Sequence, residues 1–313
     1  MKLETVRLNL LEAAVKKEKI TSCLIYHEGE IVLEYFKNKK TVTKLAHLHS
    51  VTKSVLSLLI GIAIEEGKIE SVKTPISMYF PHLEADKQGI TIEHLLTMTP
   101  GFEWPEFGAW GGRPFPMINT KNWVKFVLEQ KMTALPGESM AYNSGASHLL
   151  SAILQKAING KTAAYAEKML FQQLGISDYR WYEDAKGISI GGFNLCLRPH
   201  DLLKIGILVM QGGSWSDKQI VSEHWISDST TARYHTYDHI GSYGYHWWVL
   251  TDENRKACDP PVFFAMGYGG QYVIVSPVHH MVVVFTSELF NDTFLPLRLC
   301  KKHIFERKNF DKE

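Results

Sequence analysis

Ser50 and Lys53 place a hydroxyl and an amine three residues apart, in the segment Ser-Val-Thr-Lys. The apolar run 55–64 that follows predicts a buried helix, and residues i and i+3 of a helix share one face. A helix N-terminus offers free N–H groups and the positive end of a dipole, and apolar surroundings also disfavour a charged lysine. A neutral lysine beside a serine can activate the hydroxyl as a nucleophile. The alternative is a helix-capping serine followed by an ordinary lysine.

Tyr142 stands in a turn rich in Gly, Ser and Asn, just before a predicted helix over 147–158. A loop in this position can direct a phenol into a cleft. Asn143 and Ser144 follow the tyrosine directly and add polar groups that a substrate could contact. The segment therefore supplies a candidate proton carrier and two candidate binding residues.

Three glycines, Gly267, Gly269 and Gly270, lie in or beside a predicted strand near the C-terminus, where they would ordinarily weaken it. Close approach of a substrate to the backbone, with an amide as oxyanion donor, is one explanation. A β-bulge or a plain turn is the other.

Together these segments resemble the penicillin-recognising serine hydrolases, the family of class C β-lactamases, DD-peptidases and esterases. The 50–53 segment resembles its S-x-x-K element, 142–144 its Y-x-N element and 267–269 its K-T-G element. The resemblance continues through 92–101, 191–202 and 243–248, so it spans nearly the whole chain. Within the family, the chain is similar to the branch of 6-aminohexanoate-dimer hydrolases and related esterases.

The resemblance implies that Ser50 forms an acyl-enzyme and that Lys53 takes the serine proton. Tyr142 would relay a proton to the leaving group and later assist the attack of water. The N–H groups of Ser50 and Gly270 would form the oxyanion hole. The remaining implied substrate-binding residues are Asn143, Ser144, Gly267, Tyr268 and Gly269. The resemblance implies no metal and no cofactor.

Two positions depart from the family pattern. Ser144 stands where the Y-x-N element has Asn, and Gly267 stands where the K-T-G element has a cation. In lactamases and peptidases that lysine is expected to pair with the substrate carboxylate. Its absence favours hydrolysis of an ester or a small amide. Arg233, His235 or His239 could supply a substitute cation.

The Gly- and Pro-rich stretch after position 101 contains several aromatic residues that could cover the cleft. Trp104 and Trp110 are the predicted pocket walls, although tryptophans in such loops also often pack down onto the protein. The alternation His47-Leu48-His49 suits one face of a strand, and without an H-E-x-x-H pattern it does not favour a metal site.

The fold expected from these patterns is α+β and β-lactamase/transpeptidase-like, an antiparallel sheet flanked by helices. A helix is predicted over 5–18, a hairpin over 21–36, and strands over 262–266, 272–276 and 281–286. Helical periodicity fills the middle, as in 122–129, 147–158, 163–173 and 199–210. One domain is expected, with a sheet-containing lobe of about 1–66 plus 236–313 and an inserted, mostly helical lobe of about 67–235.

The composition narrows the classes of partner. The 34 basic and 33 acidic residues nearly balance, so neither nucleic acid nor an anionic membrane is an expected partner. The four cysteines are too scattered for a zinc site or a disulfide framework. The start of the chain has no signal-peptide pattern and no apolar run reaches membrane-spanning length, so a cytoplasmic location is expected.

The expected partner is a small ester, amide or short peptide substrate, and no oligomeric state is indicated. The rival hypothesis is a non-catalytic, penicillin-binding-like module that binds peptidoglycan fragments or a protein. A binding module has no need of a nucleophile beside two bases, which favours the enzyme.

Overall fold

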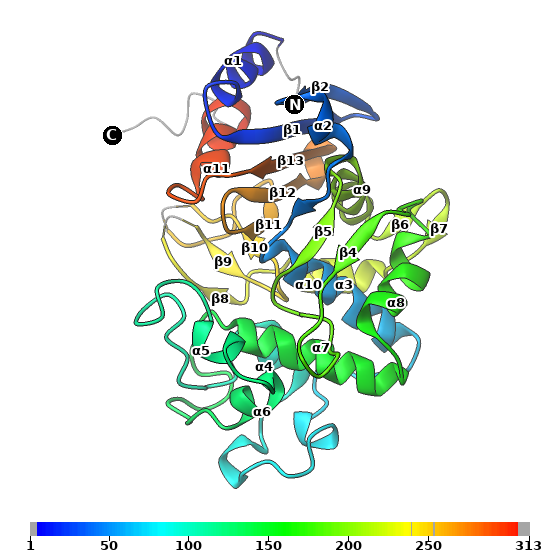
Figure 1. Cartoon of the computed structure of the whole chain (residues 1–313). Helices are drawn as coiled ribbons and strands as arrows, with labels where there is room; N and C mark the ends of the chain where they lie inside the picture. The colour runs from blue at the N-terminus through cyan, green and yellow to red at the C-terminus, as the bar shows by residue number, and fades with distance from the viewer. Residues whose placement is uncertain (1–4, 239, 253, 306–313) are drawn as a thin grey trace.

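A computed structural model describes residues 5–238, 240–252 and 254–305. Its centre is an eight-stranded antiparallel sheet in the order β2-β1-β13-β12-β11-β10-β9-β8 (Figure 1). The strands are β1 (Ile20–His27), β2 (Glu30–Phe36), β8 (Tyr234–His235), β9 (Ser242–Tyr243), β10 (Trp248–Val249), β11 (Phe263–Gly267), β12 (Gln271–Ser276) and β13 (Met281–Ser287). The predicted hairpin and all three predicted C-terminal strands are present.

The two ends of the chain meet in this sheet, because β1 pairs with β13. Leu24 faces Val284 and Ile25 faces Val283 across the ladder, and β12 and β13 are buried along their whole length. Burial of both faces explains why these strands are apolar runs rather than alternating sequences. The predicted sharing of one antiparallel sheet is therefore confirmed.

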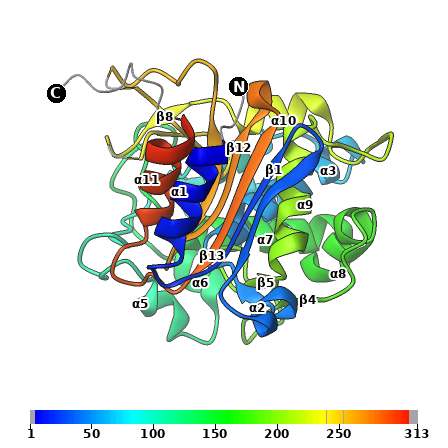
Figure 2. The ribbon, with the colours of Figure 1, turned by 90° about the horizontal axis from the view of Figure 1, so that it is seen from above.

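Helices cover both faces of the sheet (Figure 2). On one face lie α1 (Thr5–Val15) and α11 (Leu295–Cys300), followed by a π-helical turn (Lys301–Phe305). On the other face lie α3 (Val51–Glu65) and α9 (Pro199–Met210). Helix α9 falls within the range expected to form the helical lobe, but it packs against β13, β12 and β1.

Among the remaining helices, α7 (Ser144–Ile158) packs against α3, α4 (Ile92–Leu96) and α6 (Trp123–Leu128). The predicted helix over 163–173 divides into α8 (Thr162–Ala166) and a π-helical turn over Glu167–Phe171. The α-helices of this region and its connections are α2 (Lys39–Thr43), α4 (Ile92–Leu96), α5 (Phe115–Ile118), α6 (Trp123–Leu128), α7 (Ser144–Ile158), α8 (Thr162–Ala166) and α10 (Glu223–Ser229).

Two small sheets complete the fold. One has the order β3-β5-β4, with β3 at Ala46–His47, β4 at Tyr179–Trp181 and β5 at Leu195–Leu197. The other pairs β6 (Ser214–Trp215) with β7 (Lys218–Gln219). Only residues 48–50 separate β3 from α3, so the first of these sheets helps to fix where α3 begins. Among the described helices, none has the length and apolarity needed to cross a bilayer.

Candidate active site

Ser50 is the N-cap residue of α3, immediately before the helix begins at Val51. The Leu48 N–H donates to the Leu195 carbonyl at 2.9 Å, and His49 has a left-handed φ of 48° that turns the chain into the helix. The Ser50 side chain makes no capping hydrogen bond. The alternative in which this serine only caps the helix is therefore not supported.

Lys53 lies one turn along α3 and is almost wholly buried. Its Nζ donates to Ser50 Oγ at 3.0 Å, to Ser144 Oγ at 3.1 Å and to the Gly192 carbonyl at 2.6 Å. Burial lowers the pKa of Lys53 to about 8, and nearby Glu106 partly opposes that shift. The amine is thus oriented toward the serine, and a substantial fraction of it is neutral in mildly alkaline solution.

Tyr142 is buried between two aromatic rings. Phe107 stacks on it at 4.9 Å between ring centroids and Trp248 at 5.9 Å, while Lys53 Nζ lies 4.8 Å from its ring centre. Burial raises the pKa of Tyr142, with Glu106 adding to the rise, and a hydrogen bond with Ser50 opposes it. The phenol therefore stays protonated and is suited to donating a proton.

Asn143 and Ser144 have different roles. The Asn143 side chain caps α7 by accepting from the Ala146 N–H at 2.8 Å, and it is buried away from the cavity. Its predicted contact with substrate is corrected, because the helix N-terminus already uses its carbonyl. Ser144 instead lies against Lys53, and its Oγ donates to Glu106 Oε1 at 2.7 Å.

Glu106 is the main site residue that the sequence did not single out. Its buried carboxylate accepts from the Ser144 N–H at 2.8 Å, from Ser144 Oγ, and from Trp104 Nε1 at 2.8 Å. It belongs to no element of the family pattern, so only its place in an aromatic loop beside Trp104 could have suggested it. The carboxylate holds Ser144, which in turn holds Lys53.

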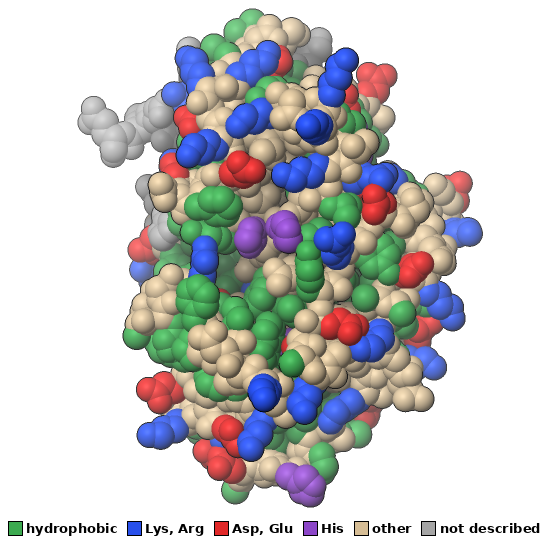
Figure 3. All heavy atoms as spheres, viewed as in Figure 1, with side chains coloured by type: hydrophobic (Ala, Val, Ile, Leu, Met, Phe, Trp, Pro, Cys, Tyr) green, Lys and Arg blue, Asp and Glu red, His purple; other side chains and the backbone are tan. Residues whose placement is uncertain are grey.

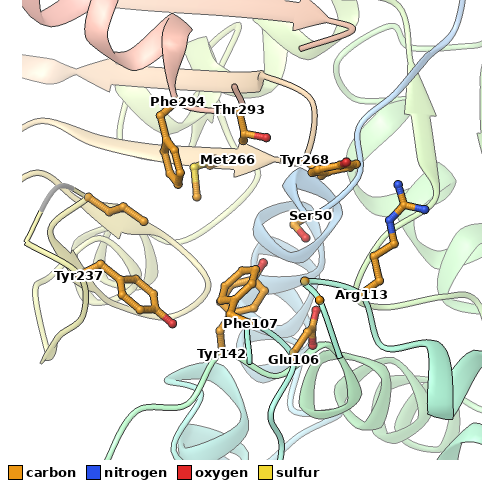
Figure 4. Close-up of a pocket in the computed structure, with 14 residues that line it drawn as sticks. Ser50, Glu106, Phe107, Arg113, Tyr142, Tyr237, Met266, Tyr268, Thr293 and Phe294 are labelled. Carbon is orange, nitrogen blue, oxygen red and sulfur yellow. The ribbon is translucent and has the colours of Figure 1, made fainter. Parts of the chain in front are cut away.

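The Ser50 hydroxyl opens into a cavity of about 370 Å³, a volume in the range of small-molecule sites (Figure 4). Figure 3 shows hydrophobic side chains gathered at mid-height on this face of the molecule, with histidines and basic side chains above them. The residues lining the cavity are Ser50, Glu106, Phe107, Gly111, Gly112, Arg113, Tyr142, Tyr237, Ile240, Met266, Gly267, Tyr268, Thr293 and Phe294.

The two predicted tryptophan walls do not line this cavity. Trp104 packs edge-on against Trp110 at 4.8 Å, and both contact Phe126. The prediction for Trp104 and Trp110 is corrected: both rings support the loop from behind. Phe107, in the same aromatic stretch, is the ring that reaches the cavity.

Gly267 lies against the start of α3. A Cβ atom here would stand 2.2 Å from the Leu48 carbonyl oxygen and 3.2 Å from the Ser50 nitrogen. No side chain fits at that distance, so the glycine lets β11 approach the serine closely. This explains the absence of a cation at position 267.

Gly270 does not suit the predicted oxyanion role. Its N–H donates to the Gly267 carbonyl at 3.2 Å, and its open side faces Leu289 and Ser287 rather than Ser50. Gly269 likewise faces Phe290, and its N–H donates to Thr293. The assignment of Gly270 is corrected, because both glycines shape the turn between β11 and β12.

Tyr268 takes the place that Gly270 was expected to fill. Tyr268 lines the cavity beside Ser50, immediately after Gly267. Within the described ranges, no backbone hydrogen bond uses the N–H of Ser50 or of Tyr268. These two amides are the better candidate oxyanion donors.

The family of the chain follows from comparison with known proteins. The β-lactamase family profile matches residues 12–298, which is most of the chain. The chain belongs to the β-lactamase family. The 6-aminohexanoate-dimer hydrolase of Paenarthrobacter ureafaciens is 20% identical over 301 residues, covering 89% of this chain and 75% of that protein.

Solved structures place this β-lactamase-family protein in the same fold. One is a Bacillus anthracis protein provisionally named a 6-aminohexanoate-dimer hydrolase, with a TM-score of 0.78, 20% identity, and coverage of 94% of this chain and 80% of that one. Another is a class C β-lactamase from Rhodobacter sphaeroides, with a TM-score of 0.71, 15% identity, and coverage of 96% and 99%. At these identities the similarity establishes the β-lactamase/transpeptidase-like fold.

His246 lies behind Lys53 and was not predicted from the sequence. Its Nδ1 is 3.1 Å from the Lys53 carbonyl oxygen and its Nε2 is 3.3 Å from Ser147 Oγ. Burial lowers the pKa of His246 to about 3, with the charge of Lys53 adding to the shift. The ring is therefore a neutral support for this part of α3.

Two of the predicted substitute cations, Arg233 and His235, do not line the cavity. Arg233 pairs with Glu93 and Asp228, His235 pairs with Asp238, and His239 lies outside the described residues. Over the described ranges no group of three or more His, Cys, Asp or Glu side chains could hold a metal ion.

Proposed function

We propose that this β-lactamase-family protein is a serine hydrolase that acts through an acyl-enzyme on an ester or small amide. The observation that carries the proposal is the buried Lys53 amine, 3.0 Å from a Ser50 hydroxyl that opens into the cavity. A lysine with a pKa of about 8 can take the serine proton near physiological pH.

Acylation would begin when Ser50 Oγ attacks the substrate carbonyl and its proton passes to Lys53. The N–H groups of Ser50 and Tyr268 would stabilise the oxyanion as the carbonyl becomes tetrahedral. The bond to the leaving group then breaks, and the leaving oxygen or nitrogen takes a proton from Tyr142. Lys53 can replace that proton, since both side chains lie beside Ser50.

Deacylation would repeat these steps with water. Water attacks the acyl carbon, its proton passes to the Tyr142 and Lys53 pair, and Ser50 leaves with a proton restored to Oγ. Glu106 and Ser144 are positioning residues in this scheme. Ser144 hydrogen-bonds the Lys53 amine and Glu106 holds Ser144, and neither side chain exchanges a proton in this scheme.

The cavity favours a small substrate with an apolar portion. The apolar and aromatic residues that line it include Tyr237, Ile240, Met266 and Phe294. Position 267 is a glycine, so the lysine that holds a β-lactam carboxylate in the family pattern is absent at this position.

The test is intact-protein mass after exposure to a fluorophosphonate probe and, separately, to p-nitrophenyl acetate and a cephalosporin. Native protein and Ser50→Ala are compared. Label on the native protein alone, with p-nitrophenol release, supports the proposal. The 6-aminohexanoate dimer serves as the amide probe, since one relative is named for its hydrolysis.

The non-catalytic alternative predicts a different result. A folded native protein that takes up no mass from any probe would reject the acyl-enzyme and favour the binding module. Circular dichroism of the native and Ser50→Ala proteins checks that both are folded.

A further inference from the structure

Arg113 is a cation that lines the cavity and has no assigned role. It lies in the loop that also carries Glu106, and its guanidinium stands 5.1 Å from the ring centre of Tyr268 and 5.6 Å from that of Phe115. Over the described part of the chain, no salt bridge or side-chain hydrogen bond engages it. Ring faces hold the plane of a guanidinium but leave its N–H edges available to an anion.

The other charged groups near Ser50 are already occupied. Glu106, the acidic residue among those lining the cavity, is bonded to Ser144 and Trp104. Lys53 is buried beneath Ser50 with three hydrogen bonds. Arg113 is therefore the charged group that a bound molecule would meet at the mouth.

Neighbouring His49 does not compete for an anion. Its ring lies edge-on to Tyr268 at 5.8 Å. Burial lowers the pKa of His49 to about 4, and the charges of His47, Arg113 and Lys53 add to the shift. The imidazole is therefore neutral where Arg113 is charged.

The cavity has two chemically different flanks on either side of Ser50 (Figure 4). Tyr237, Met266 and Phe294 lie on one side, while Arg113 and Tyr268 lie on the other. A molecule whose carbonyl reaches Ser50 can therefore place an apolar group on one flank and a charged group on the other.

We infer that Arg113 binds a carboxylate of the substrate, so that the protein prefers esters or amides carrying an anionic group on the Tyr268 side of Ser50. This inference rests on the proposed function. The guanidinium fork matches a carboxylate with two parallel N–H···O bonds. Tyr268 keeps the fork at the mouth of the cavity.

The test uses matched pairs of esters. Mono-4-nitrophenyl glutarate against 4-nitrophenyl pentanoate places the charge in the acyl half, and 4-acetoxybenzoate against methyl 4-acetoxybenzoate places it in the leaving half. Binding is measured by calorimetry in the Ser50→Ala background, so it does not depend on turnover. The variants are Arg113→Gln, Arg113→Lys and, as a control of equal charge change, Arg180→Gln at an exposed arginine of β4.

Loss of a charge-assisted bond at an exposed site predicts about 10-fold weaker binding of one anionic ester in Arg113→Gln, with its neutral partner within about 2-fold. Arg113→Lys should recover part of the loss, and Arg180→Gln should show none. The anionic pair that responds identifies which half of the substrate carries the charge.

Two results would overturn the inference: equal losses for neutral and anionic esters, which would show a structural role, or no loss for either anionic ester. Neither depends on hydrolysis. If the native protein binds anionic esters through Arg113 but cleaves none, the inference stands and the proposed function fails. In active protein the ratio of kcat/KM values, anionic over neutral, should fall by the same factor in Arg113→Gln.

Discussion

Glu106 reaches Lys53 through a single hydroxyl: Ser144 Oγ lies 2.7 Å from Glu106 Oε1 and 3.1 Å from Lys53 Nζ. A buried carboxylate thereby sits two hydrogen bonds from the amine that faces Ser50. The arrangement ties the protonation of Lys53 to a residue on a different loop.

The pH dependence of kcat/KM tests whether Lys53 is the base. If neutral Lys53 is the base, kcat/KM for a neutral ester should rise with pH and level off above the lysine pKa of about 8. The sign follows because the active form is the deprotonated amine, whose fraction grows as pH passes through that pKa. Lys53→Ala should lower kcat/KM by about 100-fold or more and remove this alkaline rise, the rising limb of the pH profile. A native profile that is flat from pH 6 to 9 would contradict the lysine assignment.

Glu106→Gln should move the same limb to lower pH. The Glu106 charge raises the pKa of Lys53, so its removal lets that pKa fall further. The amide retains one acceptor for Ser144, which limits the loss of kcat. Glu103→Gln, at an exposed site in the same loop, is the matched control and should leave the limb in place. An unchanged limb in Glu106→Gln would remove the electrostatic link.

Tyr142→Phe should reduce kcat by about 100-fold while changing KM by less than about 3-fold, because it removes a proton donor but leaves the ring stack. The raised pKa of Tyr142 also predicts no loss of native activity from phenol ionisation up to pH 10. Tyr237→Phe removes another phenol on the cavity wall and should have little effect on kcat. Steady-state kinetics of the two variants test whether the Tyr142 phenol takes part in the reaction. Equal kcat values for Tyr142→Phe and native protein would exclude it from the mechanism.

Gly267→Ala should damage the site through geometry alone. Its Cβ would meet the Leu48 carbonyl at 2.2 Å, so β11 must move away from Ser50. We expect a loss of unfolding free energy of about 1–3 kcal/mol, typical of overpacking, and a larger loss of activity. Gly89→Ala is the control, since nothing lies within 4 Å of its Cβ position. Denaturant unfolding and ester kinetics measure both effects, and a Gly267→Ala variant as active as Gly89→Ala would show that close approach is unimportant.

The sequence by itself determined the fold class and the central pair. The i, i+3 spacing of Ser50 and Lys53 depends only on local helix geometry, and it brings the two side chains within 3.0 Å. The hairpin and the C-terminal strands were visible because β-branched, apolar runs between turns are also local signals.

Tertiary structure decided everything that requires segments distant along the chain to meet. Ser144 at the start of α7 and Gly192 in a loop meet at Lys53, and Glu106 in another loop holds Ser144. No spacing in the sequence encodes that convergence. Which amide faces Ser50 also depends on the path of the turn between β11 and β12. The Gly270 N–H donates to the Gly267 carbonyl within that turn, and Tyr268 is the residue that lies beside the serine. Likewise, whether an aromatic ring lines the cavity or supports its wall depends on side-chain packing, as Phe107 and Trp104 show.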